Sequence, residues 1–311
     1  MKKILITGCN GLLGQKLVAS LVSRTDIHLI ATSLGPNRLN MQAGYLYKTL
    51  DITNKADVEK VFAKYTPDIV INTAAMTNVD ACEAQLDECW NLNVTAVKNI
   101  VEVLESQPSS PGGEKPHLIH LSTDFIFDGA KGSEYIETDI PNPLSYYALS
   151  KYESEKIVEK SRINWTIART IIIYGTADNM SRSNIVLWAK DELTKGNKIN
   201  VVDDQFRSPT LAEDLADACI LIADKGETGI YHLSGKETMS VLELVNKVAE
   251  FWNLDKSLIN PIKSITLNQA AKRPSYTGFI IDKAKENLGY TPHSFTEGLE
   301  ILDKQLNGLK L

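Results

Sequence analysis

The stretch of sequence that decides the fold is Lys3-Ile-Leu-Ile-Thr-Gly-Cys-Asn-Gly-Leu-Leu-Gly14. It begins with a short apolar run and passes through three glycines, spaced Gly8-x-x-Gly11-x-x-Gly14, into a helix-like segment. Gly8 and Gly11 let a backbone turn tightly, and Gly14 lets the helix pack closely on the strand. A strand, a glycine turn and a helix in this order are typical of the first unit of a doubly wound parallel sheet.

The start of the same helix also predicts a phosphate site. Backbone N–H groups at a helix N-terminus carry a partial positive charge and bind anionic groups. Glycines between a strand and a helix can serve the turn alone, but their place directly after the first strand favours binding. We therefore expect the pyrophosphate of a dinucleotide cofactor to contact these residues: Gly8, Asn10, Gly11, Leu12 and Gly14.

Beyond this unit, short apolar runs alternate with longer amphipathic segments over the first two thirds of the chain. Strands that are apolar on both faces and are separated by helices predict an α/β fold with a doubly wound parallel sheet, Rossmann-like, covered on both sides. We expect a dinucleotide-binding domain at residues 1–173, to which residues 205–232 return. Residues 174–204 and 233–311 are predicted to form a smaller C-terminal substrate lobe. The expected strands are Lys3–Thr7, His28–Ala31, Asp68–Asn72, Leu118–Ser122 and Thr166–Thr170, and the expected helices in this part are Leu12–Val22, Ala56–Lys64, Leu86–Glu105 and Tyr147–Lys160.

Composition argues against several classes of partner. The net charge is -6 and no Lys/Arg block stands out, so we expect neither nucleic acid nor an anionic membrane surface as a partner. No apolar run approaches the ~20 residues that a membrane helix needs. The four cysteines form no C-x-x-C pair, which favours reduced thiols and a cytoplasmic location. The five histidines show no metal-ligand spacing, and no metal is expected.

The end of the second strand indicates which cofactor is bound. An acidic residue there would hydrogen-bond the adenosine ribose and favour NAD. The sequence instead reads Ile30-Ala-Thr-Ser33, with Arg38 following and no acid before Asp51. Hydroxyl groups and an arginine suit a 2′-phosphate, so NADP(H) is favoured, with NAD(H) left open. Ser33, Arg38, Asp51 and Ile52 are the candidate contacts, although Arg38 could equally be a solvated loop residue.

Two segments further along predict the chemistry. Ser122-Thr-Asp124 follows the fourth expected strand, and Tyr147-Ala-Leu-Ser-Lys151 opens a helix after a Pro-Asn-Pro loop. Residues four apart lie on one helical face, so the phenol and the ammonium can act on one site. Lowering the pKa of a phenol from about 10 to about 7 requires roughly 4 kcal/mol, and an ammonium ~4 Å away supplies about that much in a partly buried site. We expect Tyr147 and Lys151 as the catalytic pair, with Thr123 beside the same substrate oxygen.

Two simpler interpretations compete with this pair. Tyr152-Glu-Ser-Glu-Lys156 repeats the same spacing, but Tyr152 lies ~140° around the helix from Tyr147, so both pairs cannot face one site. Lys151 could also form a surface pair with Glu155, which would contribute only a few tenths of a kcal/mol. The place of Tyr147 at the helix start, together with the glycine turn, favours the catalytic interpretation.

Together these segments resemble the extended short-chain dehydrogenase/reductases and, more narrowly, the dTDP-4-dehydrorhamnose reductase family, whose members reduce a 4-keto sugar on the way to dTDP-L-rhamnose. The resemblance spans nearly the whole chain. It rests on Asn72-Thr-Ala-Ala-Met-Thr-Asn-Val-Asp80, Ser122-Thr-Asp-Phe-Ile-Phe-Asp-Gly129, Tyr147-Ala-Leu-Ser-Lys151, Arg169-Thr170, Asp204-Gln-Phe-Arg-Ser-Pro-Thr210 and Arg273-Pro274.

The resemblance implies roles for further residues. Ala74, Ala75 and Thr77 would lie along the cofactor, as would Tyr147 and Lys151. Thr123 would complete the catalytic triad, Asp124 would touch the sugar, and Arg273 would meet the substrate diphosphate, which the guanidinium fork suits independently. The chain departs from the family at Ile172, where the family has a tryptophan at the substrate, and at Met76, where His or Tyr is frequent.

The resulting hypothesis is an NAD(P)H-dependent reductase of a nucleotide-linked 4-keto-6-deoxy sugar, in which Tyr147 protonates the ketone oxygen as C4 of NADPH delivers a hydride. One alternative is a nucleotide-sugar epimerase or dehydratase, which uses the same pair but retains NAD through its cycle. Another is a non-catalytic NADP-binding subunit that resembles the regulatory subunit of methionine adenosyltransferase. The sugar, the nucleotide base, a homodimer and a magnesium requirement are left open by the sequence.

Overall fold

A computed structural model describes residues 1–41, 43–108, 113, 115–180 and 182–308. Half of the predicted loop Ser106–Lys115 lies outside these residues. Within them, no helix combines the length and the apolar character needed to cross a membrane.

The centre of the molecule is a seven-stranded sheet in the order β11-β6-β5-β4-β1-β2-β3, and every neighbouring pair is parallel. The strand order reverses on either side of β1 and β4, which is the doubly wound topology expected from the sequence. The fold class is therefore confirmed. The strands are β1 (Lys2–Thr7), β2 (Ile27–Ser33), β3 (Leu46–Thr49), β4 (Ile69–Asn72), β5 (His117–Thr123), β6 (Asn164–Thr170) and β11 (Gly229–His232).

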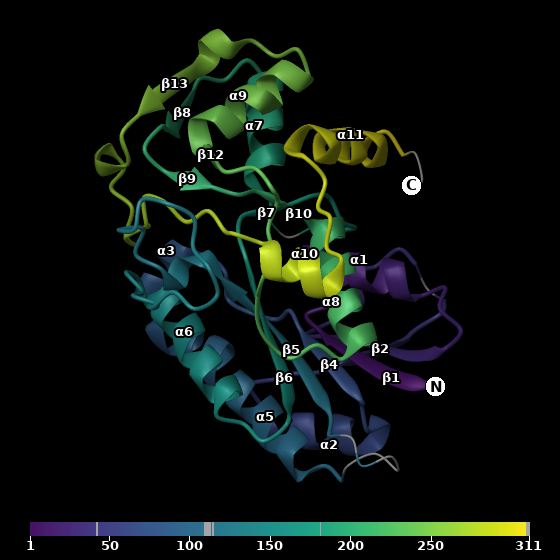
Figure 1. Ribbon diagram of the computed structural model, residues 1–311. Helices are drawn as coiled ribbons and strands as arrows, with labels where there is room; N and C mark the ends of the chain where they lie inside the picture. Colours follow the sequence, from purple (N-terminus) through teal and green to yellow (C-terminus); the bar gives the residue numbers. More distant parts are fainter. Residues whose placement is uncertain (42, 109–112, 114, 181, 309–311) are drawn as a thin grey trace.

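Helices cover both faces of this sheet, because alternate strand residues point to opposite sides. Ile4 and Ile6 pack against the helices of one face, whereas Leu5 between them packs against the other. The first face is covered by α1 (Leu12–Leu21), α8 (Ala212–Lys225) and α10 (Asp282–Leu288), and the second by α2 (Lys55–Tyr65), α5 (Ala96–Ser106) and α6 (Tyr146–Glu159), as Figure 1 shows.

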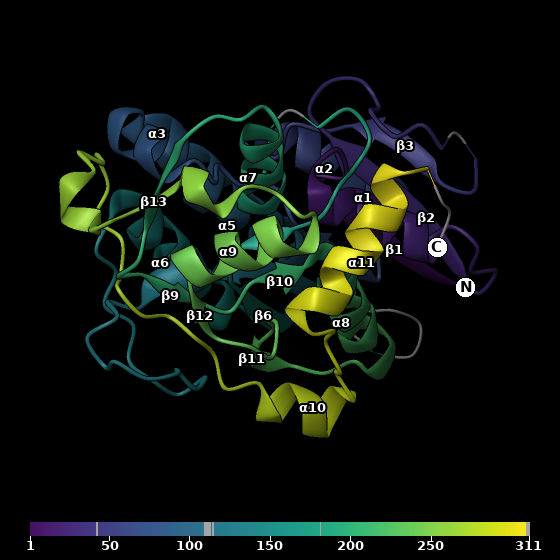
Figure 2. The same ribbon diagram turned by 90° about the horizontal axis from the view of Figure 1, so that it is seen from above.

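A second hydrophobic core lies beyond the carboxyl ends of the strands. Tyr174, just after β6, is already part of it. Figure 2 shows α11 alongside α1 and α8, where Lys16 of α1 donates to Gln305 of α11 at 3.1 Å. The elements of this region are β7 (Ile173–Tyr174), α7 (Ile185–Thr194), β8 (Ile199–Val202), β9 (Phe206–Arg207), β10 (Thr210–Leu211), β12 (Met239–Ser240), α9 (Val241–Phe251), β13 (Ile259–Ile262) and α11 (Phe295–Leu306).

Two details differ from the sequence expectations. The helix predicted over Leu86–Glu105 is divided into α4 (Leu86–Trp90), a π-helical turn at Asn91–Thr95 and α5. The segment Phe279–Tyr290, which the sequence assigned to the smaller lobe, packs into the core of the large sheet. The division into two domains itself stays a prediction.

Helix α6 is fixed to β6 by a buried ion pair. Arg169 donates from Nε and Nη2 to the two carboxylate oxygens of Glu155, at 3.1 and 2.8 Å. The two side chains are only 2% and 1% exposed. Removing one partner of such a pair leaves the other charge buried and uncompensated.

We expect Arg169→Gln to lower the free energy of unfolding by about 3–5 kcal/mol for this reason. Urea unfolding followed by tryptophan fluorescence measures the loss. The double variant Arg169→Met with Glu155→Leu should recover most of it, because no charge is then buried. A single variant that lost less than about 1 kcal/mol would show that the pair is solvated like a surface ion pair.

Candidate active site

The residues predicted to act on a ligand gather at the carboxyl edge of the sheet. Gly8 follows β1, Ser33 ends β2, and Thr123 ends β5, while the central strands β1, β4 and β5 are neighbours. Ligands of open parallel sheets bind outside this edge, at the point where the strand order reverses.

The glycine turn brings three backbone segments into contact. Gly8 has a φ of 70°, and a Cβ there would lie 2.8 Å from the backbone nitrogen of Ala74. A Cβ on Gly14 would lie 2.4 Å from the carbonyl oxygen of Gly8, so the first turn of α1 packs directly on the loop. Gly11 is the N-cap of α1 and leaves its first N–H groups without a side-chain cap. These N–H groups are free to bind an anion.

The loop after β2 is tied to this turn through Asn10. Its amide donates to the carbonyl of Pro36 at 2.9 Å, and its Oδ1 accepts from the backbone nitrogen of Arg38 at 3.0 Å. The backbone of Arg38 is thereby held near the glycine turn, and its side chain is exposed. Asp51 instead caps a local turn, accepting from the backbone and hydroxyl of Thr53.

The segment after β4 runs along the same edge. Ala74 adjoins Gly8, and Ala74 and Ala75 are half-buried. Thr77 is exposed, and Arg182 approaches its hydroxyl at 3.5 Å.

Ile52, in the segment after β3, is buried in the second face of the sheet, and its carbonyl accepts a hydrogen bond from Asn99. Cofactor contacts of these residues stay predictions.

The N-terminus of α6 is fixed on two sides. Ser145 caps it by accepting from the backbone nitrogen of Ala148, and Glu83 of α3 (Val79–Ala84) accepts from the backbone nitrogen of Tyr146 at 2.7 Å. Acidic and hydroxyl groups at a helix start satisfy N–H groups that have no partner within the helix. Tyr147 is placed by these contacts toward the end of β5.

Tyr147 is buried at 8% exposure, and its hydroxyl lies near the hydroxyl of Thr123. Burial raises the pKa of Tyr147 above its usual value, and the neighbouring Asp124 raises it further, while the Thr123 contact lowers it. The phenol therefore holds its proton at neutral pH. The sequence predicted the opposite direction, namely that the Lys151 ammonium alone lowers the pKa of the phenol toward 7.

The ammonium of Lys151 points to the inner part of β5. It donates to the carbonyl of Leu121 at 2.7 Å and lies 3.4 Å from Nε2 of His120. Burial lowers the pKa of Lys151 to about 8, while Glu155 opposes the shift. His120 is itself buried, and burial together with Lys151 lowers its pKa well below the usual value, so it is neutral.

The competing interpretations of α6 are not supported. Lys156 lies over the ring of Tyr152 at 4.2 Å and donates to Glu153, so this second pair interacts within itself on the helix surface. Glu155 bonds Arg169 in the interior, and Lys151 is only 3% exposed rather than on the surface.

The two predicted substrate contacts are engaged with protein groups. Asp124 is 3% exposed and accepts from the hydroxyls of Thr123 and Thr277. Arg273 forms a two-point pair with Asp80, at 2.7 and 3.1 Å. This pair joins the C-terminal segment to α3 and lowers the pKa of Asp80. Ile172, where the family has tryptophan, has a φ of 31°, which is rare for a β-branched residue.

Sequence reasoning missed Asn93. It lies in the π-helical turn, is 1% exposed, and binds both the backbone nitrogen (2.8 Å) and the carbonyl (3.1 Å) of Met76. It also donates to Ser150, between Tyr147 and Lys151, at 3.0 Å. Single π turns are frequent at functional sites, but nothing in the residue pattern separates this turn from a continuous helix.

The residues at the carboxyl edge fit a dinucleotide. A Cβ at Gly8 would fill the space against Ala74, and the first N–H groups of α1 have no side-chain cap. Among the described residues, Ser122 Oγ is buried with no hydrogen-bond partner. A polar ligand group at this end of β5 would satisfy it.

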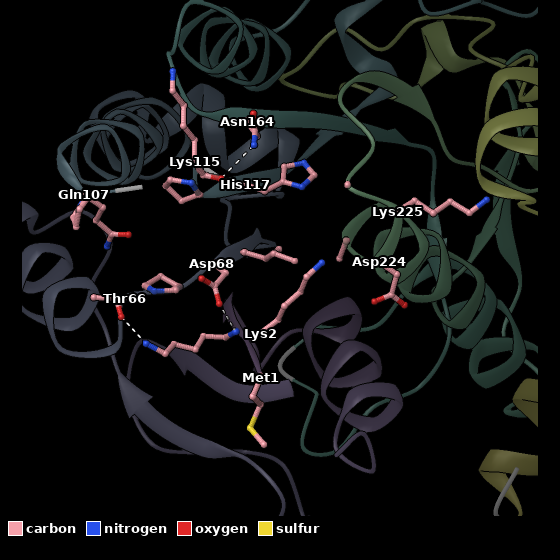
Figure 3. A pocket seen from close by; sticks show the side chains of 17 residues that line it. Met1, Lys2, Thr66, Asp68, Gln107, Lys115, His117, Asn164, Asp224 and Lys225 are labelled. Carbon is pink, nitrogen blue, oxygen red and sulfur yellow. Dashed lines mark hydrogen bonds between the residues drawn. The ribbon is translucent and has the colours of Figure 1, made fainter. Parts of the chain in front are cut away.

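A cavity of about 700 Å³ lies at the opposite edge of the sheet. It is formed at the amino ends of the strands, by Lys2, Asp68, His117 and Asn164 among others, as Figure 3 shows. Lys3 donates to Thr66 and, from its backbone, to Asp68 across this space. It is separate from every residue predicted to act on the ligand.

Comparisons with known proteins agree with this geometry. The family model described as RmlD substrate binding domain matches residues 1–307. A dTDP-4-dehydrorhamnose reductase of Aggregatibacter actinomycetemcomitans is 30% identical, over 96% of this chain and 98% of that protein. The beta subunit of methionine adenosyltransferase 2 of Xenopus laevis is 28% identical, over 84% of this chain and 75% of that protein.

A solved structure extends the likeness to the fold. The dTDP-4-dehydrorhamnose reductase of Bacillus anthracis, in complex with NADP, superposes with a TM-score of 0.81 at 28% identity, covering 98% of this chain and 100% of that chain. The match over nearly the whole chain confirms the resemblance seen in the sequence, and this chain belongs to the RmlD substrate binding domain family.

Proposed function

We propose that the chain is an NADPH-dependent reductase of a nucleotide-linked 4-keto-6-deoxy sugar, of the dTDP-4-dehydrorhamnose type. The observation that carries the proposal is the meeting of Tyr147 and Thr123 at the carboxyl edge, with Lys151 one helical turn away. The same edge holds the glycine turn. Membership of the family supports the substrate class.

The cofactor would be held by groups that the structure presents at this edge. The glycine turn with Asn10 and Leu12 would take the pyrophosphate, and Arg38 and Ser33 would take a 2′-phosphate, with Asp51 and Ile52 as further expected contacts. Ala74, Ala75 and Thr77 would follow its length, while Lys151 would bind the nicotinamide ribose. When bound, NADPH supplies the hydride that reduces the ketone carbon.

Tyr147 is the proposed proton donor to the ketone oxygen. Its raised pKa keeps the proton in place at neutral pH, so the phenol enters the reaction in the protonated form. The nearby Thr123 hydroxyl lowers the pKa of Tyr147 and so favours the phenolate that donation leaves behind. Lys151, still largely cationic at neutral pH, adds a positive charge one helical turn away.

Two alternatives have less support than the reductase. An epimerase or dehydratase would use the same pair without net consumption of NADPH. A binding subunit is suggested by the likeness to the beta subunit of methionine adenosyltransferase 2. The presence of a buried phenol, hydroxyl and ammonium at Tyr147, Thr123 and Lys151 favours an enzyme over a binding subunit, because these are the groups that proton donation to a ketone requires. We also infer a cytoplasmic location, supported by four free, buried cysteines, and leave a homodimer as an expectation.

The direct test is a turnover screen with dTDP-4-keto-6-deoxy-L-mannose and related keto sugars. Net oxidation of NADPH, with formation of the reduced sugar in equal amount, supports the reductase. Product without net NADPH loss indicates the epimerase or dehydratase. Cofactor binding without product from any keto sugar supports the binding subunit.

We expect Tyr147→Phe to lower kcat by about 10²–10⁴-fold, because the proton donor is lost. Stopped-flow or steady-state NADPH absorbance measures the rate, and NADPH affinity by fluorescence should change little. Tyr152→Phe, five positions along the same helix, is the matched control and should keep its activity. Equal losses in the two variants would rule out the assignment of the donor.

The lowered pKa of Lys151 predicts an alkaline limit for the reaction. Its pKa is lowered to about 8, so the ammonium is present below that pH and is lost as the pH rises through it. We expect kcat/KM to fall above about pH 8 in the wild-type protein. In Lys151→Met the activity should be low at every pH, whereas Lys156→Met should keep the wild-type profile. A flat wild-type profile to pH 10 would contradict a role for the ammonium.

Arg38 tests the choice of cofactor. We expect Arg38→Ala to raise the KM for NADPH about tenfold, since a charged hydrogen bond to a phosphate contributes roughly 1.5 kcal/mol or more. The KM for NADH, which lacks that phosphate, serves as the internal control and should not change. If both values rise together, Arg38 does not contact the 2′-phosphate.

A further inference from the structure

Arg207 is a buried arginine to which sequence reasoning gave no role. It lies in β9, outside the large sheet, and is 2% exposed. Its guanidinium donates to three backbone carbonyls, those of Phe206 (2.7 Å), Pro274 (2.6 Å) and Ser275 (3.4 Å). These bonds hold the guanidinium in one orientation.

That orientation directs Nε toward Asp124. Nε lies 3.6 Å from the carboxylate oxygen of Asp124, and both side chains are almost completely buried. Asp124 directly follows β5, so the pair joins the segment around β9 to the end of the central sheet. Two charges in contact inside a protein interact much more strongly than they do at the surface.

The contacts around Asp124 suit an ionised carboxylate. Thr123 donates to Oδ1 at 3.1 Å, and the Thr277 hydroxyl donates to Oδ2. Two hydroxyl donors and a guanidinium surround the carboxylate, so it acts only as a hydrogen-bond acceptor. Burial raises the pKa of Asp124, and the charge of Arg207 is the leading influence that opposes this shift.

Asp124 lies next to the proposed proton donor. Its negative charge raises the pKa of Tyr147, so by itself it opposes the charge that forms on the phenol when the proton leaves. A second contact runs through Phe125, whose ring lies 5.5 Å from the Arg207 guanidinium and packs edge-on against Tyr147 at 6.1 Å. Arg207 therefore interacts with Tyr147 indirectly, through the Asp124 carboxylate and through the Phe125 ring.

We propose that Arg207 is a positioning residue for proton donation: it neutralises Asp124 from the far side, so that negative charge can develop on Tyr147. This inference rests on the proposed function, because it assumes that Tyr147 gives up a proton. Without Arg207, an ionised Asp124 would oppose the reaction, whereas a neutral side chain at position 124 would not.

Other charged and titratable groups face this cluster and must be held constant in the test. Arg273 is near enough to lower the pKa of Arg207, and the thiols of Cys82 and Cys89 face Tyr147. Lys151 sets a separate alkaline limit near pH 8. Comparing variants that share all these groups removes their contribution from the result.

The experiment compares kcat against pH for Arg207→Gln, Arg207→Lys, and Arg207→Gln combined with Asp124→Asn. We expect Arg207→Gln to lose at least about tenfold in kcat as the pH rises through the pKa of Asp124, which the loss of the arginine charge raises further. The double variant should recover most of that loss, because no charge remains. Arg207→Lys should stay near the wild-type profile.

The matched control is Arg169→Gln, which breaks an equally buried ion pair, the one between β6 and α6. It should lower stability without this pH-dependent loss. If Arg207 served only to hold its three carbonyls, lysine and glutamine would be equally harmful and the double variant would not recover. Either result would overturn the proposal.

A second measurement does not depend on turnover. The melting temperature of Arg207→Gln should fall from pH 5 to pH 8, since a buried carboxyl with a raised pKa favours the folded state only while protonated. Addition of Asp124→Asn should remove that slope. If the wild-type protein reduces no keto sugar but the melting temperatures depend on pH in this way, the proposed function is wrong, while the charge interaction between Arg207 and Asp124 is supported. If turnover is normal and Asp124→Asn rescues neither property, the inference about Arg207 fails alone.

Discussion

The contact between the Lys151 ammonium and the carbonyl of Leu121 is the constraint on which the site depends. It ties the middle of α6 to the last residues of β5 at 2.7 Å. Glu83 holds the start of the same helix, and the Glu155–Arg169 pair holds its far side against β6. A helix fixed at three points along its length can place one phenol reproducibly at a strand end, whereas a helix held only by apolar contacts could slide and rotate.

This arrangement buries several ionisable groups, and burial shifts their pKa values in different directions. Burial raises the pKa of Tyr147 and lowers that of Lys151. Two neighbouring groups whose pKa values are moved by burial are typical of sites that carry out proton transfer. Burial of the two charges of Lys151 and Asp124 costs free energy. The neutral His120 beside Lys151 offsets part of it by a hydrogen bond, and the Arg207 guanidinium beside Asp124 offsets part of it by its charge. The buried polar network is therefore almost completely satisfied, with Ser122 Oγ one of three exceptions among the described side chains.

Much of the fold could be predicted from local patterns. The run Lys3–Gly14 and the alternation of apolar runs with amphipathic segments are local properties, and each expected strand lies within about two residues of an observed one. The π-helical turn at Asn91–Thr95 could not be predicted, because its residues are compatible with an α-helix and the bulge depends on Asn93 reaching Met76. Nor could the packing of Phe279–Tyr290 onto the large sheet, which depends on contacts far apart along the chain.

The sequence by itself determined the parallel sheet, the glycine turn at its edge and the candidates Tyr147, Lys151 and Thr123, because spacing within one element places residues on one face. Only the tertiary structure decided what surrounds them. It showed that Asp124 faces Arg207, that Arg273 faces Asp80, and that Tyr147 lies near Thr123 while Lys151 donates to Leu121. The physical reason is that the charge state of a buried group is set by neighbours from distant parts of the chain, and no local pattern of residues specifies those neighbours.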